Sequence, residues 1–117
     1  MDPARAAELL AAERARVEGH LRRLDAEFQP DAPEGLADDF DFGDQAVDLL
    51  DRERNLGRIE ELREELAAIE RAEKRLVEGT YGISIVSGEP LSDRRLEIIP
   101  YAERTAEEQR LFERGLL

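Results

Sequence analysis

Acidic side chains are the residues of this chain whose types and spacing could do chemistry. Residues 30–44 contain six of them and no basic residue. The run superficially resembles a calcium-binding loop, but Gly43 comes one place early and Leu50 stands where such loops carry a bidentate glutamate, so we do not expect calcium. Asp41 or Asp44 can instead cap a following helix, where negative charge suits the helix dipole. Capping explains one or two of these acids and leaves the others for contact with a partner.

Catalytic groups do not assemble into a recognisable set. The chain has one histidine, His20, and we interpret it as a surface residue of a charged helix. No serine, histidine and aspartate occur in a sequence context typical of a catalytic triad, and no nucleophile is paired with a base. Gly79–Gly82 is better explained as a helix stop and strand start than as a phosphate-binding loop. We predict that the protein is not an enzyme.

Composition limits the class of partner. The 117 residues, enough for one domain, include 29 acidic and 17 basic side chains, and the net charge of -12 repels DNA phosphates and anionic lipids. There is no cysteine, which excludes disulfides and thiolate metal sites. The start of the chain lacks a signal-peptide pattern, and no stretch approaches the roughly 20 apolar residues that span a bilayer. We expect a cytoplasmic protein with no direct nucleic-acid or membrane contact.

Two long helices must position the acidic run. Apolar residues at steps of three and four predict a helix over about 3–28, and a second periodic stretch predicts a helix over about 44–78. Each helix can hide its apolar stripe against the other, so we predict an antiparallel coiled-coil hairpin over 1–78 with an acidic tip loop at about 30–46. A tip centred near residue 37 would place Leu24 opposite Leu49, Val17 opposite Leu56, Leu10 opposite Leu62 and Arg14 beside Glu60.

Residues 79–117 differ from the helices before them, and we call them the cap. The β-prone run 81–86, turn residues at 87–90 and the alternating run 95–99 predict a small β-hairpin. Thr105 and Glu108 have the spacing of a capping box that opens a final helix. The predicted fold class is therefore mainly α: a long helical hairpin with a small C-terminal β-hairpin and helix.

Two motifs resemble those of the DksA/TraR family of transcription factors. In the cap, Gly79-Thr80-Tyr81-Gly82 and the later Arg95-Leu96-Glu97 followed by Pro100 match the family pattern. At the tip, Asp41-Phe42-Gly43-Asp44-Gln45-Ala46 fits the family motif Asp-x-x-Asp-x-Ala. The likeness covers about two thirds of the chain, and it implies that the cap is similar to a zinc finger.

The resemblance implies a monomer or weak homo-oligomer that binds the core of bacterial RNA polymerase. Its coiled-coil tip would enter the secondary channel, where Asp41, Asp44 and Ala46 act near the active centre and modulate initiation without touching DNA. Two alternatives remain open. One is a coiled-coil interaction protein of the same family that no longer acts on polymerase, and the other is a Gre-like transcript cleavage factor.

Four positions depart from the family pattern at its zinc site. The family has cysteines where this chain has Ser84, Ser87, Thr105 and Glu108. Neutral hydroxyls are poor zinc ligands and one carboxylate cannot complete a tetrahedral site, so we predict that zinc is absent. We expect local capping and apolar packing to replace it, with the packing supplied by Ile85, Leu96, Ile98, Leu111 and Phe112.

A second departure concerns the alarmone ppGpp, which some family members bind through basic side chains. The matching positions are Ala68, Ile99 and Gln109, and none is basic. A tetraphosphate needs cations, so we predict that ppGpp does not bind there. Arg94 and Arg95 are the nearest positive charges, and we interpret them as surface residues that pair with Glu97 or Glu103 in preference to a ligand site.

Overall fold

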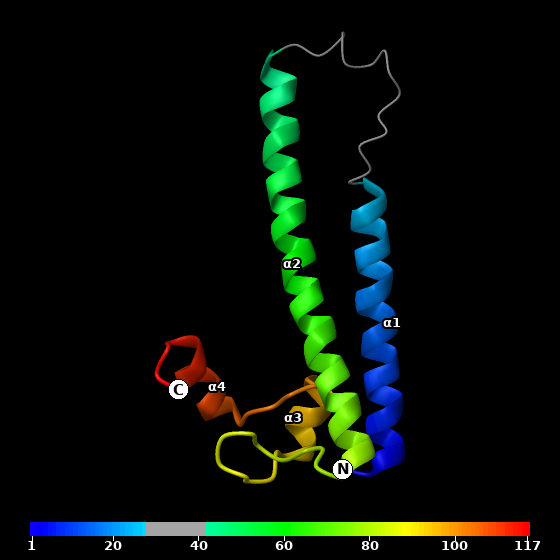
Figure 1. The fold of residues 1–117 in the computed structure, drawn as a ribbon, viewed down its shortest axis with the longest axis vertical. Coiled ribbons are helices and arrows are strands. Elements are labelled where there is room, and N and C mark those ends of the chain that lie inside the picture. The colour runs from blue at the N-terminus through cyan, green and yellow to red at the C-terminus, as the bar shows by residue number, and fades with distance from the viewer. Residues whose placement is uncertain (28–41) are drawn as a thin grey trace.

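The computed structural model describes the backbone of residues 1–27 and 42–117 and the side chains of 1–26 and 49–117. Two long helices, α1 (Pro3–Glu27) and α2 (Phe42–Glu78), lie antiparallel, and the short helices α3 (Asp93–Ile98) and α4 (Ala106–Glu113) belong to the cap at their base (Figure 1). The molecule measures 59 × 32 × 20 Å, with a radius of gyration of 19.3 Å. A compact chain of this length would have about 13 Å, so the protein is a rod.

The two long helices bury a narrow apolar stripe between them. Leu10 and Val17 of α1 meet Leu62, Ile69 and Ala72 of α2, and all five are almost completely buried. Their spacing is the three-and-four pattern that the sequence predicted. Neither long helix has an apolar run of the length and purity that a bilayer crossing requires within the described ranges.

The register between the helices differs from the one predicted. Arg14 does not meet Glu60; its guanidinium bonds Glu73 at 2.6 Å and Glu18 at 2.9 Å. Arg16 contacts Glu65 of α2 at 3.0 Å, so α1 lies two to three turns nearer the base than a tip centred at residue 37 would place it. The predicted partners Leu49 and Leu56 are accordingly 60% and 49% exposed.

Contacts at the base explain this register. Arg5 near the start of α1 donates to both carboxylate oxygens of Glu97 in α3, at 3.1 and 3.0 Å, which holds the start of α1 level with the cap. Since α1 has 25 residues and α2 has 37, the difference in length appears at the other end. The end of α2 extends beyond the end of α1 (Figure 1), and the difference of 12 residues corresponds to ~18 Å of helix.

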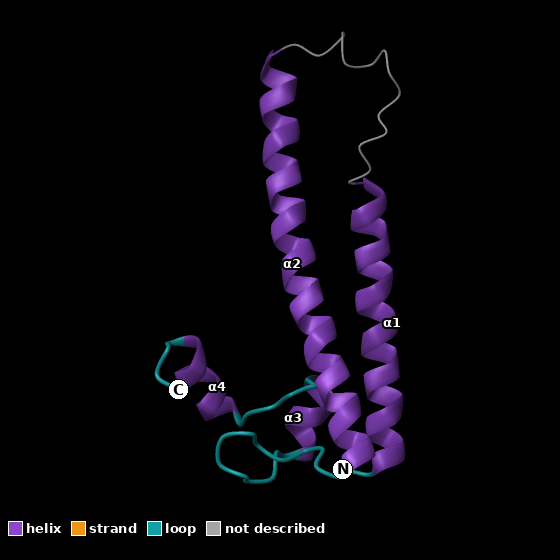
Figure 2. Cartoon of the chain, in the orientation of Figure 1, coloured by secondary structure: helices purple, strands orange, loops and turns teal. Residues whose placement is uncertain are grey.

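The predicted β-hairpin is wrong. Residues 93–98 form helix α3, and the part of the chain that the structure describes has only a single antiparallel bridge, between Ile83 and Pro90 (Figure 2). Ser92 provides the reason, because its hydroxyl accepts the backbone N–H of Arg95 and so caps a helix start. Leu96 then turns into a second apolar cluster with Leu91 and Ala102.

The final helix agrees with its prediction. Thr105 is the N-cap of α4, and its hydroxyl accepts the backbone N–H of Glu108 while the Glu108 carboxylate accepts that of Thr105. This is the reciprocal capping box that the sequence indicated. Helix α4 packs less closely against the rest of the protein than predicted, since none of its residues is buried.

Two leucines of α2 test this register. Leu62→Ala should lower the free energy of unfolding by about 2–5 kcal/mol, because it leaves a cavity at a fully buried position. Leu56→Ala on the same helix should cost less than about 1 kcal/mol, since Leu56 already faces solvent. Denaturant unfolding measures both, and equal losses would contradict the observed register.

Candidate functional site

The tip residues of the candidate site lie only partly within the described chain. Asp41 lies outside the described residues. Asp44 and Ala46 fall in the first turns of α2, at the end of that helix that projects past α1 (Figure 1). Their backbone position agrees with a tip at the end of the rod, and the structure describes no side chain there.

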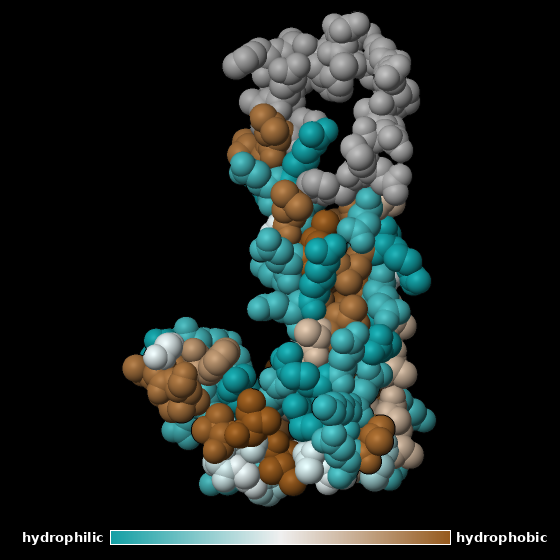
Figure 3. Space-filling model, in the orientation of Figure 1, coloured by the Kyte–Doolittle hydropathy of each residue, from teal (hydrophilic) through white to brown (hydrophobic). Residues whose placement is uncertain are grey.

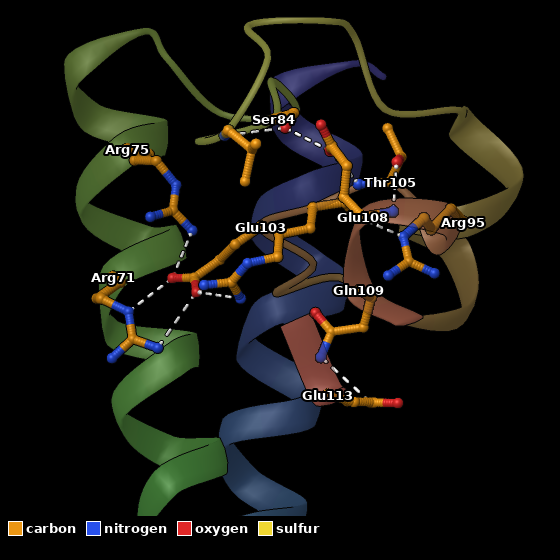
Figure 4. Close-up of polar contacts among 11 residues, drawn as sticks. Arg71, Arg75, Ser84, Arg95, Glu103, Thr105, Glu108, Gln109 and Glu113 are labelled. Carbon is orange, nitrogen blue, oxygen red and sulfur yellow. Dashed lines mark hydrogen bonds and ion pairs between the residues drawn. The ribbon is translucent and has the colours of Figure 1, made fainter. Parts of the chain in front are cut away.

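The four positions matched to the family's cysteines, by contrast, come together in the cap. Ser84 is 4% exposed, and its hydroxyl donates to Oε1 of Glu108 at 2.6 Å (Figure 4). The same hydroxyl accepts the backbone N–H groups of Val86 and Ser87, at 3.1 and 3.2 Å. Glu108 Oε1 also accepts the backbone N–H of Thr105 at 2.8 Å. These bonds join the loop before α3 to the start of α4.

The electrostatics of this cluster favour an ionised Glu108. The Ser84 hydroxyl and the backbone N–H of Thr105 stabilise the carboxylate, with smaller contributions from the Ser87 and Thr105 side chains, and they lower the pKa of Glu108 to about 2. The Ser87 hydroxyl also makes a local hydrogen bond, in which it accepts the backbone N–H of Glu89 at 3.3 Å. Each of the four positions therefore takes part in hydrogen bonds within the protein.

Apolar packing contributes less to the cap than predicted. Leu96 is 1% exposed, but Ile85, Ile98 and Phe112 are 52%, 69% and 45% exposed. The physical reason is size, since a segment this short cannot surround many large side chains. Polar contacts must hold much of the cap together.

Sequence reasoning placed Glu103 beside Arg94 or Arg95 and missed that it connects the cap to α2. Its carboxylate contacts Arg71 at 2.6 Å, Arg75 at 3.2 Å and Arg104 at 3.9 Å (Figure 4). Burial alone would raise the pKa of Glu103, but the hydrogen bond and charge of Arg71, together with those of Arg75, outweigh burial and lower the pKa. No local motif marks this connection, because the partners of Glu103 on α2 lie 32 and 28 residues away in the chain.

Tyr101 strengthens the same attachment. Its hydroxyl donates to Glu65 of α2 at 2.8 Å, and its ring packs against the main apolar cluster. Burial, followed by the hydrogen bond to Glu65, raises the pKa of Tyr101 above its ordinary range. The neighbouring Tyr81 bonds the carbonyl of Pro100 at 2.8 Å.

A cleft lies between α2 and α4, with a volume of about 680 Å³ (Figure 3). Ala68, Ile99 and Gln109, the three positions matched to ppGpp contacts, all line it. Its four arginines are engaged within the protein. Arg58 pairs with Glu61 and Arg71 with Glu103, Arg95 donates to the carbonyl of Arg104, and Arg104 stacks 3.7 Å from the ring centre of Phe112.

Arg94 and Arg95 do not make the pairs that we expected. Glu97 is taken by Arg5, and Glu103 by arginines of α2 and by Arg104. The Arg94 side chain is exposed and has no hydrogen bond or ion pair with another described residue.

Glu108→Gln tests the cluster. The folded protein holds the pKa of Glu108 near 2, below its usual value of 4.5, so ionised Glu108 stabilises the fold above about pH 4.5 and this contribution disappears as the pH falls toward 2. The variant should therefore melt at a lower temperature than the wild type at neutral pH, and the gap should close between about pH 4.5 and 2. Glu107→Gln, which removes an exposed neighbouring charge, is the control. A gap that does not change with pH would contradict the assignment.

Comparisons with known proteins agree with this geometry. No family model matches the chain. An uncharacterised protein from Bacillus subtilis, YteA, is 43% identical over 65 residues, which are 56% of this chain and 27% of that protein. The chain thus spans about a quarter of the length of this curated relative.

Solved structures are similar to this chain over more of its length than the curated relative is. The transcription factor DksA2 from Pseudomonas aeruginosa is similar over 97% of this chain and 81% of its own, with a TM-score of 0.64 and 26% identity. The RNA polymerase binding protein and transcriptional regulator Dks from Chlamydia trachomatis is also similar over 94% of this chain and 93% of its own, at 26% identity and a TM-score of 0.44. The DksA2 likeness extends over both long helices and the cap. Together with the motifs at the tip and in the cap, it supports the assignment of this chain to a DksA-like family.

Proposed function

We propose that this protein regulates transcription by binding the core of bacterial RNA polymerase, with the distal end of α2 entering the secondary channel. The observation that carries this proposal is the projection of α2 past α1 in a fold similar to that of the transcription factor DksA2. The projecting end holds Asp44 and Ala46, two residues of the tip motif. At about 1.5 Å per residue, Asp44 lies ~50 Å from the base of α2.

Charge supports the same proposal. A net charge of -12 opposes contact with DNA, while an acidic rod is attracted to a basic channel that contains bound cations. The paired helices also suit a channel, because the whole molecule, cap included, measures only 32 and 20 Å along its two shorter axes. The factor would thus alter initiation from the protein side of the complex, with Asp41 and Asp44 near the active centre.

We also propose that the cap holds no structural zinc. The donor set supports this, because Ser84, Ser87 and Thr105 offer neutral hydroxyls and only Glu108 offers a charged ligand. The Ser84 hydroxyl is fully used, with two N–H groups accepted and one proton donated to Glu108. A metal at this place would have to break bonds that already join the two halves of the cap.

The cleft between α2 and α4 is proposed not to bind ppGpp. Its arginines are committed to Glu61, Glu103 and the Arg104 carbonyl or stacked on Phe112, and further glutamates, including Glu64 and Glu113, line the same cleft. A tetraphosphate would meet these carboxylates without free cations to offset them.

Paired substitution of the tip tests the function. Asp41→Asn with Asp44→Asn should leave the affinity for core polymerase nearly unchanged but abolish the effect on initiation, because only the charge near the active centre is lost. The measurements are pull-down of core polymerase and transcription in vitro. Glu60→Gln with Glu78→Gln, which removes two exposed charges far from the tip, should change neither.

Three outcomes would refute parts of this proposal. Failure of the wild-type protein to bind core polymerase would refute it entirely. Binding with an unchanged effect in the tip variant would favour an interaction protein that does not act through its tip. Stimulated cleavage of backtracked transcripts would favour a Gre-like factor.

Metal analysis tests the cap. The purified, folded protein should contain far less than one zinc per chain by mass spectrometry, and a chelator should leave its melting temperature unchanged, because protein groups satisfy the cluster. One bound zinc per chain, lost together with cap structure on chelation, would contradict the proposal.

A further inference from the structure

An apolar groove of about 450 Å³ lies on the cap, between α3 and the start of α4. Leu91, Ile98 and Ile99 provide much of its lining. Leu91 belongs to the buried cluster of the cap, whereas Ile98 is 69% exposed. A single exposed isoleucine is ordinary, but one that borders a concave apolar surface suits contact with another molecule.

The charge of this groove is opposite to that of the chain. The protein has 29 acidic residues, yet none of those that the structure describes lines the groove, and Arg94 and Arg95 do. The acids of α3 are engaged elsewhere: Asp93 pairs with the Met1 ammonium at 2.9 Å and Glu97 pairs with Arg5. Arg94 and Ile98, four residues apart, share the face of α3 that borders the groove.

Arg94 has an unused guanidinium. Arg71, Arg75 and Arg104 of the surrounding surface all contact Glu103, but Arg94 pairs with no other described residue. The two hydroxyls of the groove already serve as N-caps, since Ser92 accepts the N–H of Arg95 and Thr105 that of Glu108. A carboxylate held against Arg94 would therefore supply a charge partner that the fold lacks.

We propose that this groove binds an acidic peptide segment of a partner protein that carries large apolar side chains. An apolar side chain of the segment would occupy the groove beside Ile98, and a neighbouring carboxylate would pair with Arg94. A basic segment would find no counter-charge there. A second copy of this chain is disfavoured by mutual repulsion, since each copy has a net charge of -12. The groove lies on the cap, far from the tip, so this proposal does not depend on the proposed action at polymerase.

Fluorescence anisotropy tests the proposal with a short fluorescein-labelled peptide of leucine and aspartate. Its matched probe has lysine in place of every aspartate. The wild-type protein should bind the acidic probe at least about tenfold more tightly than the basic one, and added salt should weaken that binding. Arg94→Glu and Ile98→Ser should each lower the affinity about tenfold.

Arg110→Glu is the matched control, because it reverses an exposed arginine on α4 that lies outside the groove and pairs with no other described side chain. It should change the affinity less than about twofold. Arg94 and Ile98 are exposed, so both variants should keep the melting temperature of the wild type. Three results would overturn the proposal: no binding of the acidic probe, equal binding of both probes, or an equal loss in Arg110→Glu. Self-association of the free protein that Ile98→Ser abolishes would instead assign the groove to a second copy.

Discussion

The Glu108 carboxylate connects the two halves of the cap, the part of the fold that contacts both long helices at their base. It accepts hydrogen bonds from the hydroxyl of Ser84 on one side and the backbone N–H of Thr105 on the other. Charge-assisted bonds of this kind are shorter and stronger than neutral ones. They matter here because the cap buries few large side chains, so packing alone would not fix the loop before α3 against α4.

The assembled cap then sets the geometry of the long helices. Glu103 binds Arg71 and Arg75 of α2, and Glu97 of α3 binds Arg5 of α1, so both helices are held at the base. Because their register is fixed there, the greater length of α2 emerges at the opposite end as a projecting, acidic helix. The same arrangement separates two surfaces of different chemistry, the tip proposed to act at polymerase and the apolar groove beside Arg94.

The sequence predicted the features that depend on local patterns. Apolar spacing indicated both long helices to within two residues at each end, and the pair Thr105 and Glu108 indicated the start of α4. It failed at residues 95–99, which alternate like a strand although Ser92 caps a helix there, a local signal that the alternation obscured. It also failed where distant contacts decide, because the ion pairs of Arg14 depend on a register that no local motif specifies. For the site, the motif comparison brought Ser84 and Glu108 into one cluster, while Glu103 had no such signal.

Amide hydrogen exchange of the folded protein tests most directly whether protein hydrogen bonds hold the cap. The N–H groups of Val86, Ser87 and Thr105, which donate to Ser84 and Glu108, are the reporters. The structure predicts slow exchange at all three, unchanged by a chelator, and faster exchange at all three together in Glu108→Gln. Rapid exchange in the wild type, or protection that a chelator removes, would contradict the account.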